Sequence, residues 1–304
     1  MDYFSSTLTQ VLSLFIIIIV GYILYKTNAV PKNTDKVLSR LLSLVMLPAL
    51  CFKTLITNLT VDVISYKWSF LVFGLAGVSF SYIAAILLSK FFAKDRYNRH
   101  IYTYSFTVAN LGYMGYTIIG SVFGSEMLAN MLIFAVPFNI FIYTIGYSIL
   151  TGHEKITLKS LVNPVCIALL VGAIIGLLGL HMPAFVIDVA DALGNCMGPT
   201  AMLVTGFVVA QYNPLKLLKN GRVLIASILR LLVIPTVIVL LFKLCGASKE
   251  IIIVTLGSTA MPLGLNTVVF PASCGKDTTT GASMALVSNI LGVITIPIMF
   301  MLFL

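Results

Sequence analysis

The sequence is poor in charge, has one tryptophan and lacks paired cysteine motifs. Charged side chains make up 10% of the 304 residues, against about 25% in soluble proteins. The five cysteines form no C-x-x-C pair, so we predict no metal and no cofactor, and we expect buried, reduced thiols. The chain also has no G-x-S-x-G and no H-E-x-x-H motif, which argues against a hydrolase or an intramembrane protease.

Long apolar stretches are what the chain has instead, because 59% of its residues are hydrophobic. A membrane-spanning helix needs about 20 largely apolar residues. Ten such segments follow one another at 8–27, 34–56, 68–91, 100–123, 127–151, 160–180, 184–211, 220–244, 250–273 and 280–304. The first lacks the basic start of a signal peptide, so we expect it to remain as a helix. The sequence predicts an all-α polytopic protein with ten transmembrane helices in a lipid bilayer.

The net charge of +9 could indicate nucleic acid, but the basic residues sit in loops between apolar segments. With the N-terminus outside, the inward side holds Lys26, Lys32, Lys36, Arg40, Lys90, Lys94, Arg96, Arg99, Lys155, Lys159, Lys216, Lys219, Arg222 and Lys276. The outward side holds only Lys53, Lys67, Lys243 and Lys249. Because cytoplasmic loops are enriched in Lys and Arg, we expect a plasma-membrane protein with both termini extracytoplasmic and no nucleic-acid partner.

An internal repeat is indicated by similar residues about 151 positions apart. Four pairs of short motifs recur at offsets of 150 to 152: Val20-Gly21 with Val171-Gly172, Leu47-Pro48-Ala49 with Gly198-Pro199-Thr200, Asn110-Leu111-Gly112 with Pro262-Leu263-Gly264, and Asn139-Ile140 with Asn289-Ile290. Chance similarity among apolar helices is the alternative. Five helices per half is an odd number, so the second half must enter the membrane from the opposite side. We therefore predict two inverted five-helix repeats, residues 1–152 and 153–304.

Segments four and nine are interrupted near their centres by Gly, Pro and Asn. Paired interruptions in two repeats are typical of transporters that bind their cargo between broken helices, although kinks for close helix packing are the alternative. The predicted substrate site comprises the interruptions together with the prolines of segments two and seven: Asn110, Gly112, Tyr113, Pro262, Gly264, Asn266, Pro48 and Pro199.

The predicted site contains amides, hydroxyls and helix N-termini, and no acidic residue falls clearly at mid-membrane. Helix N-termini favour anions, so we expect a small organic anion, a carboxylate. Arg230 lies inside segment eight. We expect its long side chain to snorkel toward the cytoplasmic interface, and the alternative is attraction of an anion into a cavity.

Four motifs carry a resemblance to a known family: Leu47-Pro-Ala-Leu-Cys-Phe52, Leu161-Val-Asn-Pro164, Leu193-Gly-Asn-Cys-Met-Gly-Pro199 and Ala260-Met-Pro-Leu-Gly-Leu-Asn-Thr267. In order and spacing they resemble the auxin efflux carrier family of membrane transport proteins, in particular its bacterial permease-type members. The resemblance implies a homodimer, a scaffold of helices 1, 2, 6 and 7, and a transport domain of helices 3–5 and 8–10.

The resemblance also implies cargo binding where helices 4 and 9 cross, with Asn110 facing the substrate and Gly264 in the matching motif of helix nine. Plant members have proline a few residues beyond each interruption, whereas this chain has Thr117 and Thr267. The departure predicts less sharply broken helices and argues against auxin as the cargo.

These observations favour a secondary transporter, not an enzyme, that moves a small organic anion by alternating access. A sodium-coupled symporter of the bile-acid-transporter type is the alternative, with Ser258 and Thr259 as candidate sodium ligands. A channel is a further alternative, which paired broken helices fit less well.

Overall fold

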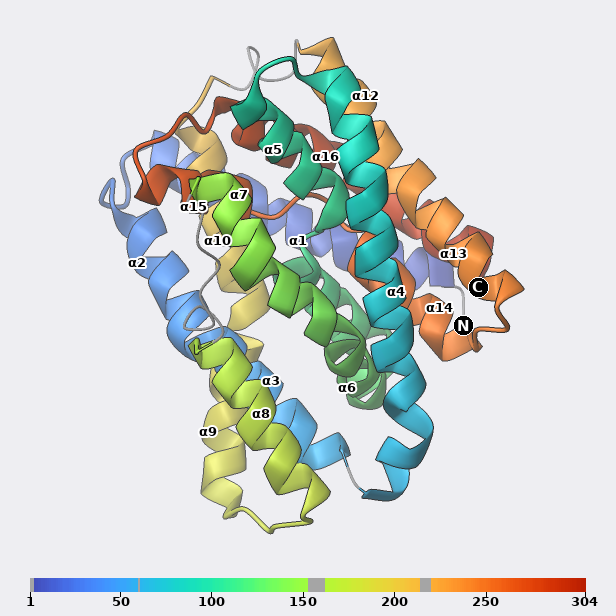
Figure 1. Cartoon of the computed structure of the whole chain (residues 1–304). Coiled ribbons are helices and arrows are strands. Elements are labelled where there is room, and N and C mark those ends of the chain that lie inside the picture. The colour runs from blue at the N-terminus through green and yellow to red at the C-terminus, as the bar shows by residue number, and fades with distance from the viewer. Residues whose placement is uncertain (1–2, 60, 153–161, 214–219) are drawn as a thin grey trace.

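The computed structural model in Figure 1 describes residues 3–59, 61–152, 162–213 and 220–304. Within these ranges the chain forms helices and no strand, as the all-α prediction requires. Four basic residues used in the orientation argument lie outside the described residues: Lys155, Lys159, Lys216 and Lys219. The same is true of residue 153, where the second predicted repeat begins.

Seven helical stretches of the described chain are long and apolar enough to cross a membrane. They are Phe4–Lys26, Thr34–Asn58, Lys67–Phe92, Arg96–Thr151, Ala184–Ala210, Gly221–Leu244 and Thr279–Phe303. Pro164–Leu177 is a shorter apolar helix. Segment nine is split into two short helices, so it is not among these stretches.

The first half of the chain contains three uninterrupted or nearly uninterrupted helical segments, followed by a broken one. Its elements are α1 (Tyr3–Lys26), α2 (Thr34–Leu41), the π-helical turn η1 (Leu42–Met46), α3 (Leu47–Asn58), α4 (Val61–Phe92), α5 (Arg96–Thr107), η2 (Leu111–Gly115), α6 (Tyr116–Phe141), η3 (Ile142–Gly146) and α7 (Tyr147–Thr151). Residues 108–110, between α5 and η2, are not helical.

The 56-residue stretch Arg96–Thr151 folds back on itself at Gly124. Gly124 has a φ of 86° inside α6, a conformation that glycine adopts without steric cost. His100 Nδ1 lies 3.1 Å from the carbonyl oxygen of Ile149, although 49 helical residues would span about 74 Å in a straight helix. The stretch therefore supplies two antiparallel segments, which match predicted segments four and five.

The second half contains α8 (Pro164–Leu177), α9 (Ala184–Asn195), α10 (Met197–Ala210), α12 (Gly221–Ile228), η5 (Leu229–Val233), α13 (Ile234–Leu244), α14 (Lys249–Thr259), α15 (Asn266–Ser273) and α16 (Thr279–Phe303). Residues 260–265 separate α14 from α15 and are not helical. Both breaks interrupt their helices completely although the chain has Thr117 and Thr267 at the places discussed above. That these helices are less sharply broken than those of plant members stays an expectation.

Backbone conformations recur at the repeat distance that the sequence predicts. Asn28 (φ 54°) and Gly179 (φ 61°) are 151 residues apart, as are Gly124 (φ 86°) and Gly275 (φ 66°). Gly275 lies between α15 and α16, which fold back on each other, since a β-carbon on Gly281 would meet the backbone of Thr267. Each half thus contains a broken helix, a glycine turn and a returning helix.

Predicted segment six, 160–180, is shorter in the structure than expected. Helix α8 begins at Pro164, and the Asn163 side chain caps it by accepting a hydrogen bond from the Cys166 amide at 3.0 Å. Proline is favoured at the first position of a helix, where its missing N–H costs nothing. The expectation of buried cysteines is confirmed for Cys51 only, because Cys166 is half-buried and Cys196, Cys245 and Cys274 are exposed.

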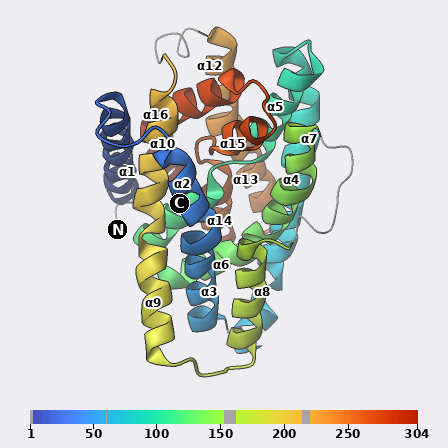
Figure 2. The same cartoon turned by 90° about the vertical axis from the view of Figure 1, so that its left-hand side faces the viewer.

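Helices from the two halves pack together in two groups. In Figure 2, α9 and α10 form one column, α1 lies beside α10, and α3 lies between α9 and α8. The approach is close, because a β-carbon on Gly176 of α8 would lie 2.6 Å from the Leu59 carbonyl oxygen. The other group is built from α4 packed on α5 and α6, α14 on α6 and α13, and α12 on α16. Helix α1 also contacts α16 of this second group.

Candidate functional site

The two breaks in the helices meet and are joined by a backbone hydrogen bond. The Asn110 amide, at the end of the first break, donates to the Pro262 carbonyl oxygen in the second at 2.8 Å. The Asn110 carbonyl in turn accepts from the amides of Met114 and Gly115, at 3.1 and 3.0 Å. Backbone groups freed by broken helices are costly in a membrane unless they find partners. The breaks therefore satisfy one another in part, and we call their meeting point the crossover.

A small cavity of about 40 Å³ lies at the crossover, and we call it the crossover cavity. Its lining comes from both breaks and from neighbouring helices: Leu47, Ala109, Asn110, Leu111, Gly112, Tyr113, Asn139, Ile142, Tyr143, Gly264, Leu265 and Asn266. Five of the predicted site residues thus line one cavity: Asn110, Gly112, Tyr113, Gly264 and Asn266. No acidic residue is in this lining.

Two helices begin at the crossover cavity. The second half of the first broken helix starts with η2 at Leu111, and α15 starts at Asn266. The first N–H groups of a helix have no partner within the helix, and they carry the positive end of its dipole. Neither Asn110 nor Leu265, at the capping positions, makes a capping hydrogen bond with its side chain. The positive ends of these two helix dipoles therefore lie at the lining of the cavity.

The two predicted asparagines are held differently. Asn110 is 5% exposed, and its side-chain oxygen would lie 3.3 Å from a β-carbon on Gly264, so it packs against the opposite break. Asn266 donates from Nδ2 to the Tyr104 hydroxyl at 2.7 Å, across the two halves of the chain. Tyr104 is 1% exposed, so this hydrogen bond orients Asn266 within the protein interior.

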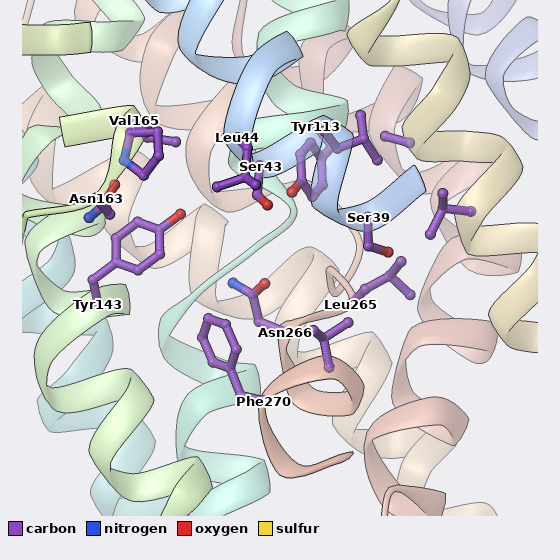
Figure 3. Close-up of a pocket in the computed structure, with 15 residues that line it drawn as sticks. Ser39, Ser43, Leu44, Tyr113, Tyr143, Asn163, Val165, Leu265, Asn266 and Phe270 are labelled. Atoms are coloured by element: carbon purple, nitrogen blue, oxygen red, sulfur yellow. The ribbon is translucent and has the colours of Figure 1, made fainter. Parts of the chain in front are cut away.

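A larger cavity of about 260 Å³ adjoins the crossover cavity, and we call it the Ser39 cavity. It shares Tyr113, Tyr143, Leu265 and Asn266 with the crossover cavity and extends to Ser39, Ser43, Asn163 and Phe270. In Figure 3 the hydroxyl groups of Tyr113 and Tyr143 and the amide of Asn266 point toward one another in the cavity. The sequence analysis missed Tyr143, which lies one helical turn beyond Asn139 of the repeat motif.

A third cavity, the Lys53 cavity, has a volume of about 280 Å³ and lies on the other side of the crossover. Helices α3, α6, α9 and α10 line it, and the first three contribute polar side chains, among them Lys53, Thr54, Ser121, Ser125, Asp191 and Asn195. Lys53 and Asp191 form an ion pair of 2.7 Å there. Tyr116 of this cavity accepts a hydrogen bond from Asn139 of the crossover cavity at 3.3 Å, so these two side chains stand between the two cavities.

The three predicted prolines are less central than the asparagines. Pro262 contributes its carbonyl to the crossover but is not in the lining of these three cavities. Pro199 lines the Lys53 cavity, away from the crossover cavity. Pro48 is buried near the start of α3 and lines none of the three. Its neighbour Leu47 does line the crossover cavity.

Arg230 does not snorkel to the interface as we expected. Its side chain is 2% exposed, and NH1 donates to the Thr259 carbonyl at 2.8 Å. That carbonyl ends α14, where the negative end of the helix dipole stabilises a cation. This attraction holds the guanidinium inside the protein. Arg230 does not line the three cavities described above.

The candidate sodium ligands Ser258 and Thr259 lie at the end of α14. The Ser258 hydroxyl is fully buried and has no hydrogen-bond partner among the described atoms. The Thr259 hydroxyl donates to the Thr255 carbonyl at 2.6 Å, and its own carbonyl is bound by Arg230. Within the described ranges, no cluster of three or more His, Cys, Asp or Glu residues could hold a metal ion.

Comparison of the chain with known proteins gives a match to a protein family. The family model described as membrane transport protein matches residues 6–158 and 149–300, which together cover almost the whole chain. No curated protein matches the chain.

Proposed function

Because the chain belongs to the membrane transport protein family, the family of the auxin efflux carriers, we propose that it is a secondary transporter of a small carboxylate. Membership makes it a multi-pass membrane transporter and not an enzyme. The observation that carries the proposed cargo is the crossover cavity, where two helix N-termini and two asparagines converge and the lining has no acidic residue. Amide donors and helix N-termini favour a carboxylate, whereas a cation would lack compensation there.

We propose ten transmembrane helices in two inverted repeats, 1–152 and 153–304. Support comes from the matched breaks and from the two pairs of positive φ values 151 residues apart. A scaffold of helices 1, 2, 6 and 7 corresponds to α1, α2 with α3, α8, and α9 with α10. The remaining helices would form the transport domain. The packing of α1 on α10 and of α3 on α8 and α9 agrees with this division.

The mechanism that we propose is alternating access through the three cavities. The Ser39 cavity begins near the basic residues Lys36 and Arg40, so the positive-inside rule places it on the cytoplasmic side of the plasma membrane. The Lys53 cavity would then face outward, and both termini would be extracytoplasmic. Since the Ser39 cavity shares four lining residues with the crossover cavity, this conformation would be open to the cytoplasm.

A thermal-shift screen of the purified protein against mono- and dicarboxylates, with amines as the contrasting set, tests the cargo. A ligand that binds the folded state raises the melting temperature by mass action. We expect carboxylates to stabilise the protein and to show saturable flux, accelerated by counter-transport, in proteoliposomes. Stabilisation and flux by amines alone would overturn the proposal.

Sodium coupling is the second candidate, and the buried, unpartnered Ser258 hydroxyl favours it. One observation argues against it. The guanidinium of Arg230 donates a hydrogen bond to the Thr259 carbonyl, and its positive charge would repel a sodium ion bound there. Carboxylate flux that disappears when sodium is replaced by potassium would establish the symporter. A homodimer, which rests on the family resemblance alone, is testable by the mass of the detergent-solubilised protein.

A further inference from the structure

Arg230 is a buried positive charge near the middle of a membrane-spanning segment. It lies in η5, in the segment Gly221–Leu244. At 1.5 Å per residue it is roughly 14 Å from one end of this segment and 21 Å from the other. Arginine stays protonated in proteins. The side chain is 2% exposed, so this position carries a full charge inside the membrane.

The charge of Arg230 is not paired with an acid in the described part of the chain. Its NH1 donates to the Thr259 carbonyl, a dipole and not an ion, and its Nε has no partner among the described atoms. The ion pairs found among those residues are Lys53–Asp191 and Lys67–Glu126. Each of these pairs has no net charge, so neither changes the net charge of the proposed transport domain. An uncompensated buried charge is costly, which suggests that something else compensates it.

The crossover cavity lies beside the break that follows α14, the helix whose end binds Arg230. Thr259 is three residues before Pro262, whose carbonyl binds Asn110. Three residues of extended chain span at most roughly 10 Å. Within a poorly hydrated protein interior, a charge at such a distance still attracts an anion. Arg230 does not touch the cavity, so it would act through the field alone.

We infer that Arg230 is a fixed positive charge that moves with the crossover and serves as the internal counter-ion of the cargo. The inference rests on the proposed transport function. When a monocarboxylate is bound, its charge of −1 and the charge of +1 on Arg230 cancel. The empty transport domain keeps the charge of +1 on Arg230. The membrane potential then acts on the return of the empty carrier and not on the loaded step.

The charge balance over a full cycle is unchanged. Import moves a neutral loaded domain inward and a +1 empty domain outward, which together equals one negative charge moved inward. A negative interior therefore slows net import through the empty step. Exchange of one labelled anion for an unlabelled one uses only the loaded step. The rate of exchange therefore does not depend on the membrane potential.

The experiment compares exchange with net uptake in proteoliposomes that hold the full-length protein. The probe is radiolabelled lactate, with the potential set by a potassium gradient and valinomycin. For the wild type, lactate exchange should change less than twofold between 0 and −100 mV. Net uptake into lactate-free vesicles should fall several-fold, up to roughly sevenfold if half of the field energy acts on the barrier.

Two variants separate the charge from a structural role. Arg230→Lys keeps the charge and should behave like the wild type. Arg230→Met removes it, so exchange should become dependent on the potential. A wild type whose exchange depends on the potential as strongly as net uptake does would overturn the inference and leave the transport function intact, whatever the folding of Arg230→Met. Absence of carboxylate flux in the wild type would overturn the proposed function, and the inference with it.

Discussion

Asn110 and Asn266 present their amides to one cavity from opposite breaks of the crossover. A carboxylate gains charge-assisted hydrogen bonds from such donors, and each is worth about 1.5–3 kcal/mol when made to a charged group. We therefore expect Asn110→Ala and Asn266→Ala each to weaken carboxylate binding by tenfold or more, measured by the ligand-induced shift in melting temperature and by proteoliposome flux.

Asn289→Ala is the matched control for these two variants. Asn289 is 5% exposed, as Asn110 is, but its Nδ2 donates to the Ala285 carbonyl within its own helix at 2.8 Å. It is outside the lining of the crossover cavity. Flux that stays normal in both crossover variants would move the binding site elsewhere. Loss of folded protein in those variants alone would assign the amides a structural role.

The sequence could indicate residues at the breaks but not all of their partners. Asn110, Gly264 and Asn266 are identifiable because Asn, Gly and Pro interrupt apolar segments at matched positions. Tyr104 and Tyr143 lie in helical segments that contain no Gly or Pro next to them to mark a site. Their side chains lie at the crossover because α5 and η3 pack against it. The buried position of Arg230 could not be predicted, because its partner, the Thr259 carbonyl, is a backbone group that the break in another helix leaves without a helical partner.

At the scale of helices, the contact between η2 and α14 depends on two glycines. A β-carbon on Gly115 would meet the backbone carbonyl oxygen of Gly257 and would lie 2.8 Å from the Met131 methyl group. Backbone cannot move aside as a side chain can. We therefore expect Gly115→Ala to destabilise the protein by about 1–3 kcal/mol, the usual cost of overpacking, measured by thermal unfolding in detergent.

Gly221→Ala provides the control for this contact. Gly221 begins α12, and a β-carbon there would have no atom within 4 Å, so the change should stay within about 0.5 kcal/mol. Equal stability of Gly115→Ala and Gly221→Ala would contradict the close approach of η2 and α14.

Most helical segments are predictable from the sequence, because a run of about 20 apolar residues in a membrane protein forms a spanning helix. The residues at which helices begin and end are harder to predict. Helix α8 is shorter than predicted because Asn163 and Pro164 start it locally, a signal hidden within an apolar run. Helix α4 begins at Val61, before the apolar segment predicted to start at residue 68.

At the scale of the whole molecule, the ten-helix arrangement makes a prediction about the membrane faces. Single cysteines are introduced at Asp95 and at Leu304, in a background where the exposed Cys196, Cys245 and Cys274 are serine. A membrane-impermeant thiol reagent should label position 304 from outside intact cells, and position 95 only after the inner face is made accessible. The reason is the fourteen-to-four division of basic residues between the loops of the two sides.

Labelling at position 2 gives the matching test of the other terminus. Ten helices require positions 2 and 304 to lie on the same face. Labelling of the two positions from opposite faces would show that the helix count is odd and that the inverted repeat is wrong.

The central claim is that the crossover helices move against a scaffold, and one contact reports on it directly. The Ser125 hydroxyl donates to Asn58 Oδ1 at 3.4 Å, which joins the turn region of α6 to the end of α3. The proposed motion must break this contact. The Lys53–Asp191 pair, at 2.7 Å, lies within the proposed scaffold and should persist.

The decisive measurement is carboxylate flux after cross-linking with a short thiol-specific reagent, in the background without exposed cysteines. In Asn58→Cys/Ser125→Cys, cross-linking should abolish flux, and a reductant should restore it. In Lys53→Cys/Asp191→Cys, the same cross-link should leave the flux of that variant unchanged. Full flux through the cross-linked Asn58→Cys/Ser125→Cys protein would contradict a crossover that moves against the scaffold.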